Sequence, residues 1–249
     1  MNLAWLAASG LGHGDCEAIR SGWLGQPVNA LTSLVFLAAG AWIAARARKA
    51  PLERAELWTF GLLVASNALG SFLFHGPRPL GSRWVHDLSA LSIPLFVAIH
   101  DVGLVRGWTV TSRLRWFAAG LVGVGVVLAA PGTLVPLGFL AAAGAGVGEL
   151  LAFRAGYRPR PGRASGAQLA AWGVGLVTLA LAGLAFLFGR SDSPLCEPES
   201  LFQLHGGWHL LVAVASMAWA LAAFELRGAP PEPAGTGTIA PTAPRGDRP

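Results

Sequence analysis

The sequence predicts an all-α membrane protein, a seven-transmembrane helix bundle with its N-terminus outside and its C-terminus in the cytoplasm. Hydrophobic residues make up 53% of the 249 residues and charged residues only 12%, about half the charged share of a typical soluble domain. Seven apolar runs approach the roughly 20 residues that a transmembrane helix needs. The lysines and arginines gather in every second loop, a pattern typical of multi-pass membrane proteins.

The seven runs follow one another along most of the chain. Glycine and proline occur within several of them, which membrane helices tolerate better than soluble ones do. The only lysine, Lys49, lies between two runs, which excludes a retinal protein because its Schiff base needs a lysine within a helix. The predicted spans are residues 28–45, 57–75, 86–105, 114–130, 134–151, 169–188 and 202–226.

The segments that flank the spans have different compositions. Residues 1–27 are predicted to form an extracytoplasmic N-terminal cap, since the first ten lack the basic region and the apolar length of a secretory signal. Residues 28–226 form the seven-helix domain. Residues 227–249 are rich in proline, glycine and threonine, so we expect a disordered cytoplasmic tail.

Basic residues indicate the orientation in the membrane. Of the 18 lysines and arginines, 14 follow the odd-numbered runs, and the positive-inside rule therefore places the N-terminus outside. The net charge of +5 is then a topology signal and not a sign of nucleic-acid binding. The arginine-rich, lysine-poor usage favours a bacterial source, so we expect an integral, multi-pass protein of the bacterial cell (inner) membrane.

Polar residues lie at the outer ends of three predicted spans. Ser71 and His75 are four residues apart at the end of the second span, and His205 and His209 have the same spacing at the start of the last, so each pair shares a helix face. Asp87 lies near the start of the third span. Polar groups inside a membrane are costly and are therefore functional candidates.

Three histidines at one depth predict a metal centre. With an open fourth position, they form the ligand set of a catalytic zinc, which lowers the pKa of a bound water to about 7. Asp87 could then move a proton, and Ser71 could bind the water or an oxyanion. There are three alternatives. The histidine pair could be hydrogen-bonded without a metal, and His75 could simply lie at the membrane interface. Asp87 could only cap its helix or pair with Arg83.

Other polar residues near the span ends are expected to be structural. His86 directly precedes Asp87 and is therefore expected to point to a different face of the helix. His100 and Asp101 are expected at a solvated helix end, and Glu149 is expected to pair with Arg154.

The two cysteines predict a disulfide. Cys16 and Cys196 are the only cysteines, and both lie in segments predicted to be outside the cytoplasm, where disulfides form and persist. The bond would tie the N-terminal cap to the loop before the last span. Two unpaired buried thiols are the alternative.

The combined motifs resemble those of the alkaline ceramidases, in a wider superfamily of seven-helix zinc membrane hydrolases that also includes the progestin and adiponectin receptors. The matching pieces are SFLFH (Ser71, His75), HD (Asp87) and HGGWH (His205, His209), and the resemblance spans residues 14–226. It implies that the three histidines bind zinc and that Ser71 and Asp87 flank the bound water. The implied reaction is hydrolysis of the amide bond of a ceramide-like lipid to a sphingoid base and a fatty acid.

The resemblance extends to the N-terminal DCEAIRSGWLGQPVNALTSLVF, where the family binds calcium. Asp15 and Glu17 match its acidic cluster, but Gln26 replaces a glutamate and Ile19 an asparagine. Since carboxylates set the affinity of a calcium site, we expect weak calcium binding or none. The loop that leads to Asp87 is also slightly longer than the family pattern.

Two further functions are compatible with the same motifs. The chain could be a receptor or binding protein that keeps the metal without turnover, or a hydrolase of another lipid amide or ester. The sequence shows no signalling motif in its tail, which favours a membrane enzyme with a lipid substrate and no nucleic-acid partner. The sequence does not indicate the acyl-chain preference or the oligomeric state.

Overall fold

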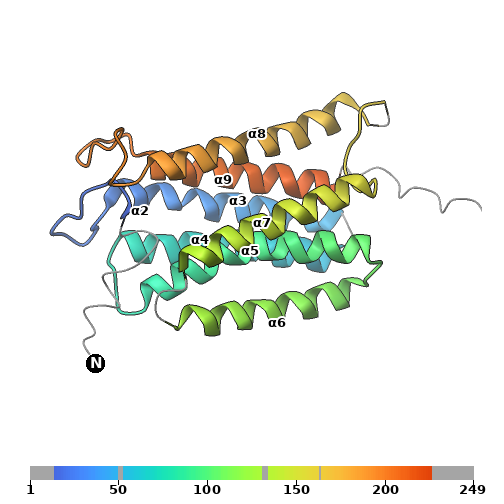
Figure 1. Ribbon diagram of the computed structural model, residues 1–249, viewed down its shortest axis with the longest axis horizontal. Coiled ribbons are helices and arrows are strands. Elements are labelled where there is room, and N and C mark those ends of the chain that lie inside the picture. The colour runs from blue at the N-terminus through green and yellow to red at the C-terminus, as the bar shows by residue number, and fades with distance from the viewer. Residues whose placement is uncertain (1–13, 50–52, 131–133, 163, 226–249) are drawn as a thin grey trace, which may run out of the picture.

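The computed structural model describes residues 14–49, 53–130, 134–162 and 164–225. The helices run back and forth along one long axis (Figure 1), and the predictions for residues 1–13 and for the tail after residue 225 lie outside the described residues. The helices are α2 (Pro27–Ser33), α3 (Val35–Arg46), α4 (Arg54–His75), α5 (Ser82–Val105), α6 (Val110–Leu128), α7 (Leu134–Arg154), α8 (Gly166–Phe188) and α9 (Leu204–Ala220). Short turns η2 (Ala47–Lys49) and η3 (Leu221–Glu225) follow α3 and α9.

Six helical stretches within the described residues are long and apolar enough to cross a membrane. They correspond to the first four, the sixth and the seventh predicted spans. The fifth predicted span forms α7, which has 21 residues but is not among the six. The structure therefore has the all-helical form of a multi-pass membrane protein, and a seventh span and the orientation of the termini remain predictions.

The first predicted span is divided into α2 and α3, which meet at Leu34. Just before this junction, the hydroxyl of Thr32 donates to the carbonyl of Val28 at 2.7 Å, and the hydroxyl of Ser33 donates to the carbonyl of Ala30 at 2.6 Å. Hydroxyl groups that bond back to the preceding turn bend helices. The division therefore follows from two consecutive residues of this type.

Four helices form the centre of the bundle and three cover it. Helices α3, α4, α5 and α9 surround the core, α6 and α7 pack on α5, and α8 packs on α9 (Figure 1). Most large side chains of α8 are exposed leucines and valines, as expected of a membrane helix that faces lipid. The core includes Phe36, Ile43, Leu57, Phe60, Val64 and Phe96.

Glycines allow α3 and α4 to approach closely. A Cβ on Gly40 would collide with the backbone of Gly61 and Ala65, and a Cβ on Gly61 would lie 2.8 Å from the backbone nitrogen of Ala44. Small residues at a helix crossing are a common means of packing in membranes, because they bring backbones into contact. This crossing fixes the helix that carries the first histidine of the candidate site.

We call the end of the bundle beside residues 14–26 the cap end and the other the arginine end. At the arginine end, Glu56 of α4 accepts hydrogen bonds from Nε of Arg113 at 2.7 Å and from Nδ1 of His100 at 3.0 Å. His100 is 1% exposed and Asp101 is fully buried. The expectation that these two residues lie at a solvated helix end is wrong, because α6 and the loop after α7 cover them with arginines.

Arg158, in the loop after α7, connects two carboxylates. Its Nε and Nη2 atoms each donate to Glu149 at 2.8 Å, and Nη2 also donates to Asp101. The indole N–H of Trp172 on α8 donates to Glu149 at 2.8 Å. Glu149 therefore pairs with Arg158 and not, as expected, with Arg154, and the network joins α5, α7 and α8 at the arginine end.

Candidate metal centre

Three histidines meet at the cap end of the bundle. His75 ends α4, and His205 and His209 lie in the first two turns of α9. All three are buried, and one nitrogen of each lies within 4.8 Å of the others. Their ring centroids are 4.8 to 5.7 Å apart. As the histidine spacing predicted, this group could hold a metal ion.

Hydrogen bonds at Nδ1 orient two of the rings. Nδ1 of His75 lies 2.6 Å from Oε1 of Gln26, and Nδ1 of His209 lies 3.0 Å from Oγ1 of Thr32. The amide oxygen can only accept, and the threonine hydroxyl already donates to the carbonyl of Val28, so both imidazoles carry their proton on Nδ1. Each therefore presents an unprotonated Nε2, the form that binds a metal.

Two of the Nε2 atoms lack a hydrogen bond, those of His75 and His205, which are buried and have no hydrogen-bond partner among the described residues. Nε2 of His209 has the hydroxyl of Ser71 at 3.2 Å. Unpaired buried polar atoms are costly, typically by about 1–3 kcal/mol each. A metal ion bound by the three rings would satisfy the Nε2 atoms, so the residues present fit a metal site.

Ser71 lies beside the histidines, one helical turn before the end of α4. It is buried, and its Oγ is 3.2 Å from Nε2 of His209. The preceding Gly70 lets α5 approach this turn, since a Cβ there would lie 3.0 Å from the carbonyl oxygen of Val85. The structure thus brings a hydroxyl group and the start of α5 to the same place.

Asp87 is buried near the start of α5 and pairs with His86. Nδ1 of His86 donates to Oδ1 of Asp87 at 2.8 Å, and Nε of Arg83 is 3.5 Å from Oδ2. The His86 ring is buried and lies 5.5 Å from the ring of His75. The expectation that His86 points away is wrong, because α5 already begins at Ser82 and its first turns pack closely on α4.

The segment that resembles a calcium site does not fit calcium. Both carboxylate oxygens of Glu17 accept backbone N–H groups, of Val28 and Asn29, at 2.8 Å each. Asp15 faces the guanidinium of Arg190 at 3.3 Å. Burial raises the pKa of Asp15 to about 7, with Arg190 opposing the shift, and burial also raises the pKa of Glu17. Calcium needs about six to eight oxygen ligands, and both carboxylates here already have partners within the chain.

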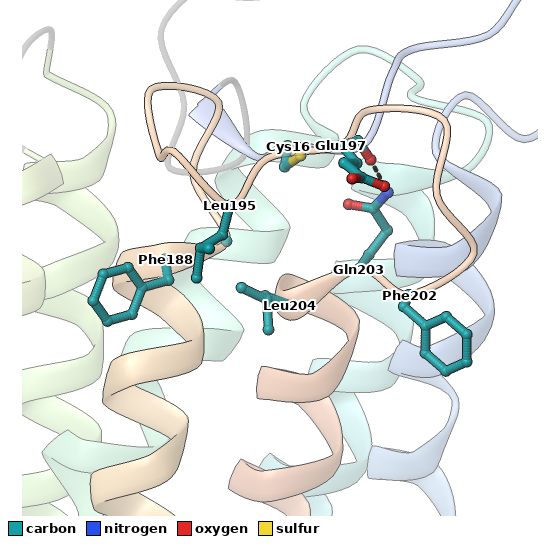
Figure 2. Close-up of a pocket in the computed structure, with 8 residues that line it drawn as sticks. Cys16, Phe188, Leu195, Glu197, Phe202, Gln203 and Leu204 are labelled. Atoms are coloured by element: carbon teal, nitrogen blue, oxygen red, sulfur yellow. Dashed lines mark hydrogen bonds between the residues drawn. The ribbon is translucent and has the colours of Figure 1, made fainter.

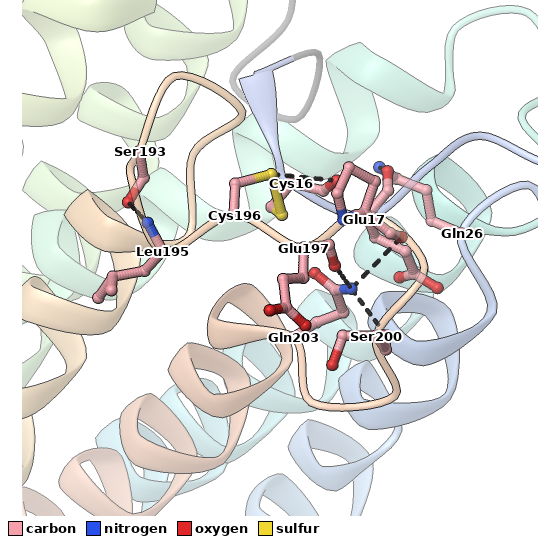
Figure 3. The surroundings of a disulfide bond; sticks show 10 residues. Cys16, Glu17, Gln26, Ser193, Leu195, Cys196, Glu197, Ser200 and Gln203 are labelled. Atoms are coloured by element: carbon pink, nitrogen blue, oxygen red, sulfur yellow. Dashed lines mark hydrogen bonds between the residues drawn. A yellow bond between two sulfur atoms is a disulfide. The ribbon is translucent and has the colours of Figure 1, made fainter.

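A disulfide joins the cap end of the chain to the loop between α8 and α9. It links Cys16 and Cys196 across 180 residues, as predicted (Figure 3). The backbone N–H of Cys16 also donates to the carbonyl of Gly189 at 2.9 Å, and the amide group of Gln203 donates to the carbonyl of Glu197 at 3.1 Å. These bonds fix residues 14–17 over the start of α9.

A small pocket lies beside the disulfide, between the end of α8 and the start of α9 (Figure 2). It has room for about one water molecule, which is too little for a lipid chain. Phe202 at its rim points outward and is 95% exposed. The pocket is lined by Cys16, Phe188, Gly189, Leu195, Glu197, Phe202, Gln203 and Leu204.

Sequence reasoning did not find the partners of the histidines. Gln26 is 49 residues from His75, and Thr32 is 177 residues from His209, so no local spacing connects them. No family model, curated protein or solved structure matches the chain. The function must therefore be inferred from the geometry of the site and from its motif.

Proposed function

We propose that the protein is a zinc-dependent hydrolase of lipid amides that works within the membrane. The observation that carries the proposal is the buried group of His75, His205 and His209, in which Nε2 of His75 and Nε2 of His205 have no hydrogen-bond partner among the described residues. Three histidines with an open fourth position are a common catalytic zinc site. The resemblance to alkaline ceramidases makes the amide of a ceramide-like lipid the proposed substrate, with a sphingoid base and a fatty acid as products.

Zinc is the proposed metal because of the imidazole donor set together with the resemblance to the alkaline ceramidases. Cys16 and Cys196 are bonded to each other and offer no thiolate. Imidazole nitrogen suits zinc, copper, iron and nickel, and the resemblance favours zinc among these. When bound, zinc would supply a water with a pKa lowered to about 7 and a Lewis acid for the substrate carbonyl.

Asp87 is proposed to move the proton. His86 holds its Oδ1, and Oδ2 has only the longer contact with Arg83 among the described residues. The carboxylate would accept a proton from the attacking water as the C–O bond forms, and return it to the amine nitrogen as the C–N bond breaks. Ser71, whose hydroxyl lies beside His209, would donate a hydrogen bond to the oxyanion that develops on the carbonyl.

The proposed orientation explains why the site lies at a bundle end. We propose that α7 completes seven spans, with the N-terminus outside the cytoplasm of a bacterial cell and the cap end at the outer surface. Among the described residues, the three histidines lie just inside this end, within a turn or two of the ends of α4 and α9. A lipid in the outer leaflet has its amide at a similar depth and could reach the site sideways.

The test combines metal analysis with a lipid assay on the purified full-length protein. We expect stoichiometric zinc, release of free sphingoid base from ceramide, loss of turnover on chelation, and recovery with added zinc. His209→Ala should lose zinc and turnover together, whereas His100→Gln, at the arginine end, should keep the zinc. Stoichiometric zinc and full turnover in His209→Ala would refute the proposal, and zinc without turnover of any lipid amide or ester would favour a receptor or binding protein.

A further inference from the structure

The imidazoles differ in the oxygen atom that faces Nδ1. Two of them face the neutral oxygens of Gln26 and Thr32. Nδ1 of His205 instead lies 3.3 Å from Oδ1 of Asp15, a residue that is only 5% exposed. Residues 15–32 thus place one oxygen beside each of the three rings, and the oxygen beside His205 belongs to a carboxyl group.

Backbone contacts and an arginine hold Asp15 in this position. Asp15 and Arg190 form an antiparallel bridge just after α8, and the N–H of Ser191 donates to the carbonyl of Gly14 at 2.6 Å. Nη1 of Arg190 lies 3.3 Å from the same Oδ1 of Asp15. A Cβ on Gly14 would collide with the guanidinium, so the glycine makes room for it. Cys16, the next residue, is fixed by the disulfide.

The charges of this group compensate one another. A buried carboxylate is costly unless a positive group accompanies it, and Arg190 supplies that charge. In metal proteins, a carboxylate beside the far nitrogen of a histidine ligand fixes the ring orientation and makes the ligand more basic. Oδ2 of Asp15 and Nδ1 of His205 have no hydrogen bond among the described residues, so both side chains have the capacity for this pairing.

We propose that Asp15 is a positioning residue for the metal ligand His205 and that Arg190 sets the place and charge of Asp15. The inference rests on the proposed zinc site, in which Nε2 of His205 is a ligand. It also gives Asp15 a role other than the calcium binding that the sequence resemblance implied. The positive charge beside the Asp15 carboxylate is supplied by the side chain of Arg190.

Zinc affinity of the full-length protein in detergent tests the inference, measured by competition with a chelator of known affinity. We expect Asp15→Ala to raise the zinc Kd by about 10- to 100-fold, the usual effect of removing such a partner. Asp15→Asn and Arg190→Gln should raise the Kd by smaller factors, since each keeps part of the arrangement. The matched controls are Arg20→Gln and Glu199→Gln, an exposed ion pair of the same loops at 3.2 Å, which should leave the Kd unchanged.

A second measurement separates positioning from simple loss of folding. The unfolding midpoint of the zinc-free protein should differ little between wild type and Asp15→Asn. The difference should widen when zinc is added, because the stabilisation by bound zinc grows with the logarithm of its affinity. If Asp15→Ala does not fold, the zinc Kd values of Asp15→Asn and Arg190→Gln test the positioning role in its place.

The outcomes distinguish this inference from the zinc site itself. A wild-type Kd in the Asp15 and Arg190 variants, with zinc lost in His209→Ala, would overturn the positioning role and leave the zinc site in place. Equal weakening in the two control variants would also overturn it. A wild-type protein that binds no zinc would overturn both proposals.

Discussion

Asp87 and His86 form a buried pair, with Nδ1 of His86 2.8 Å from Oδ1 of Asp87. A carboxylate that must accept and return a proton works best when its orientation is fixed. His86 provides that orientation, and its ring also packs on His75 at 5.5 Å. At the residue scale, the pair therefore links Asp87, the proposed proton-transfer group, to a histidine of the candidate metal centre.

Substitution of this pair should separate turnover from metal binding. We expect Asp87→Asn to keep its zinc, because Asp87 is not a proposed ligand, and to lose about 10²–10⁴-fold in turnover, the usual range for a general acid or base. His86→Ala should also keep zinc and lose turnover, though by a smaller factor, since the carboxylate remains. Metal analysis and the ceramide assay are the measurements, with the exposed Glu199→Gln as a control. Wild-type turnover in Asp87→Asn would contradict the assigned role.

At the element scale, the crossing of α3 and α4 depends on Gly40 and Gly61. We expect Gly61→Ala to destabilise the protein by about 1–3 kcal/mol, the cost of overpacking a close contact, because the added Cβ would lie 2.8 Å from the backbone of Ala44. Gly146→Ala on α7 is the matched control, since nothing lies within 4 Å of a Cβ there. Thermal unfolding in detergent measures both, and equal midpoints would argue against the crossing.

The second element-scale feature is the clamp of Arg158 on Asp101 and Glu149, which joins α5, α7 and α8. Removing one partner of a buried ion pair leaves an uncompensated charge and costs about 3–5 kcal/mol, so Arg158→Ala should unfold at a clearly lower temperature. Arg154→Ala, four residues earlier and exposed, should change the midpoint little. A similar loss in both variants would show that general charge at this end, and not the clamp, is responsible.

At the scale of the whole molecule, the disulfide connects the start of the described chain to the loop between α8 and α9. Closing a loop of 180 residues stabilises by about 5 kcal/mol in the chain-entropy description. Cys16→Ser with Cys196→Ser should therefore lower the unfolding midpoint, and should weaken zinc binding because residues 14–17 lie over the start of α9. Thiol labelling of the denatured, unreduced wild type checks the bond itself, and two free thiols would contradict it.

The orientation of the whole bundle gives the last prediction. Reporter fusions after residues 163 and 227 should read cytoplasmic, and a fusion after Ser193 should read extracytoplasmic, because 14 of the 18 basic residues follow odd-numbered spans. A cytoplasmic signal at Ser193 would place the histidine group at the inner surface. An extracytoplasmic signal at residue 227 would indicate an even number of spans.

The sequence by itself determined the helices, the end at which the histidines meet and the disulfide. Hydropathy is a local property, so each apolar run indicates a helix without knowledge of its neighbours. The spacing of four between His205 and His209, and between Ser71 and His75, fixes a shared face by helix geometry alone. With only two cysteines, the pairing had one possible partner.

Tertiary structure decided which remote group each of these side chains meets. Gln26 and Thr32 face the histidine rings because the broken first span packs beside α4 and α9, and Arg190 reaches Asp15 because a short backbone bridge aligns them. His86 turns toward the site, and Glu149 pairs with Arg158, for the same reason. Hydrogen-bond partners depend on positions to within a fraction of an ångström between segments far apart in the chain, and no local pattern of residues specifies that distance.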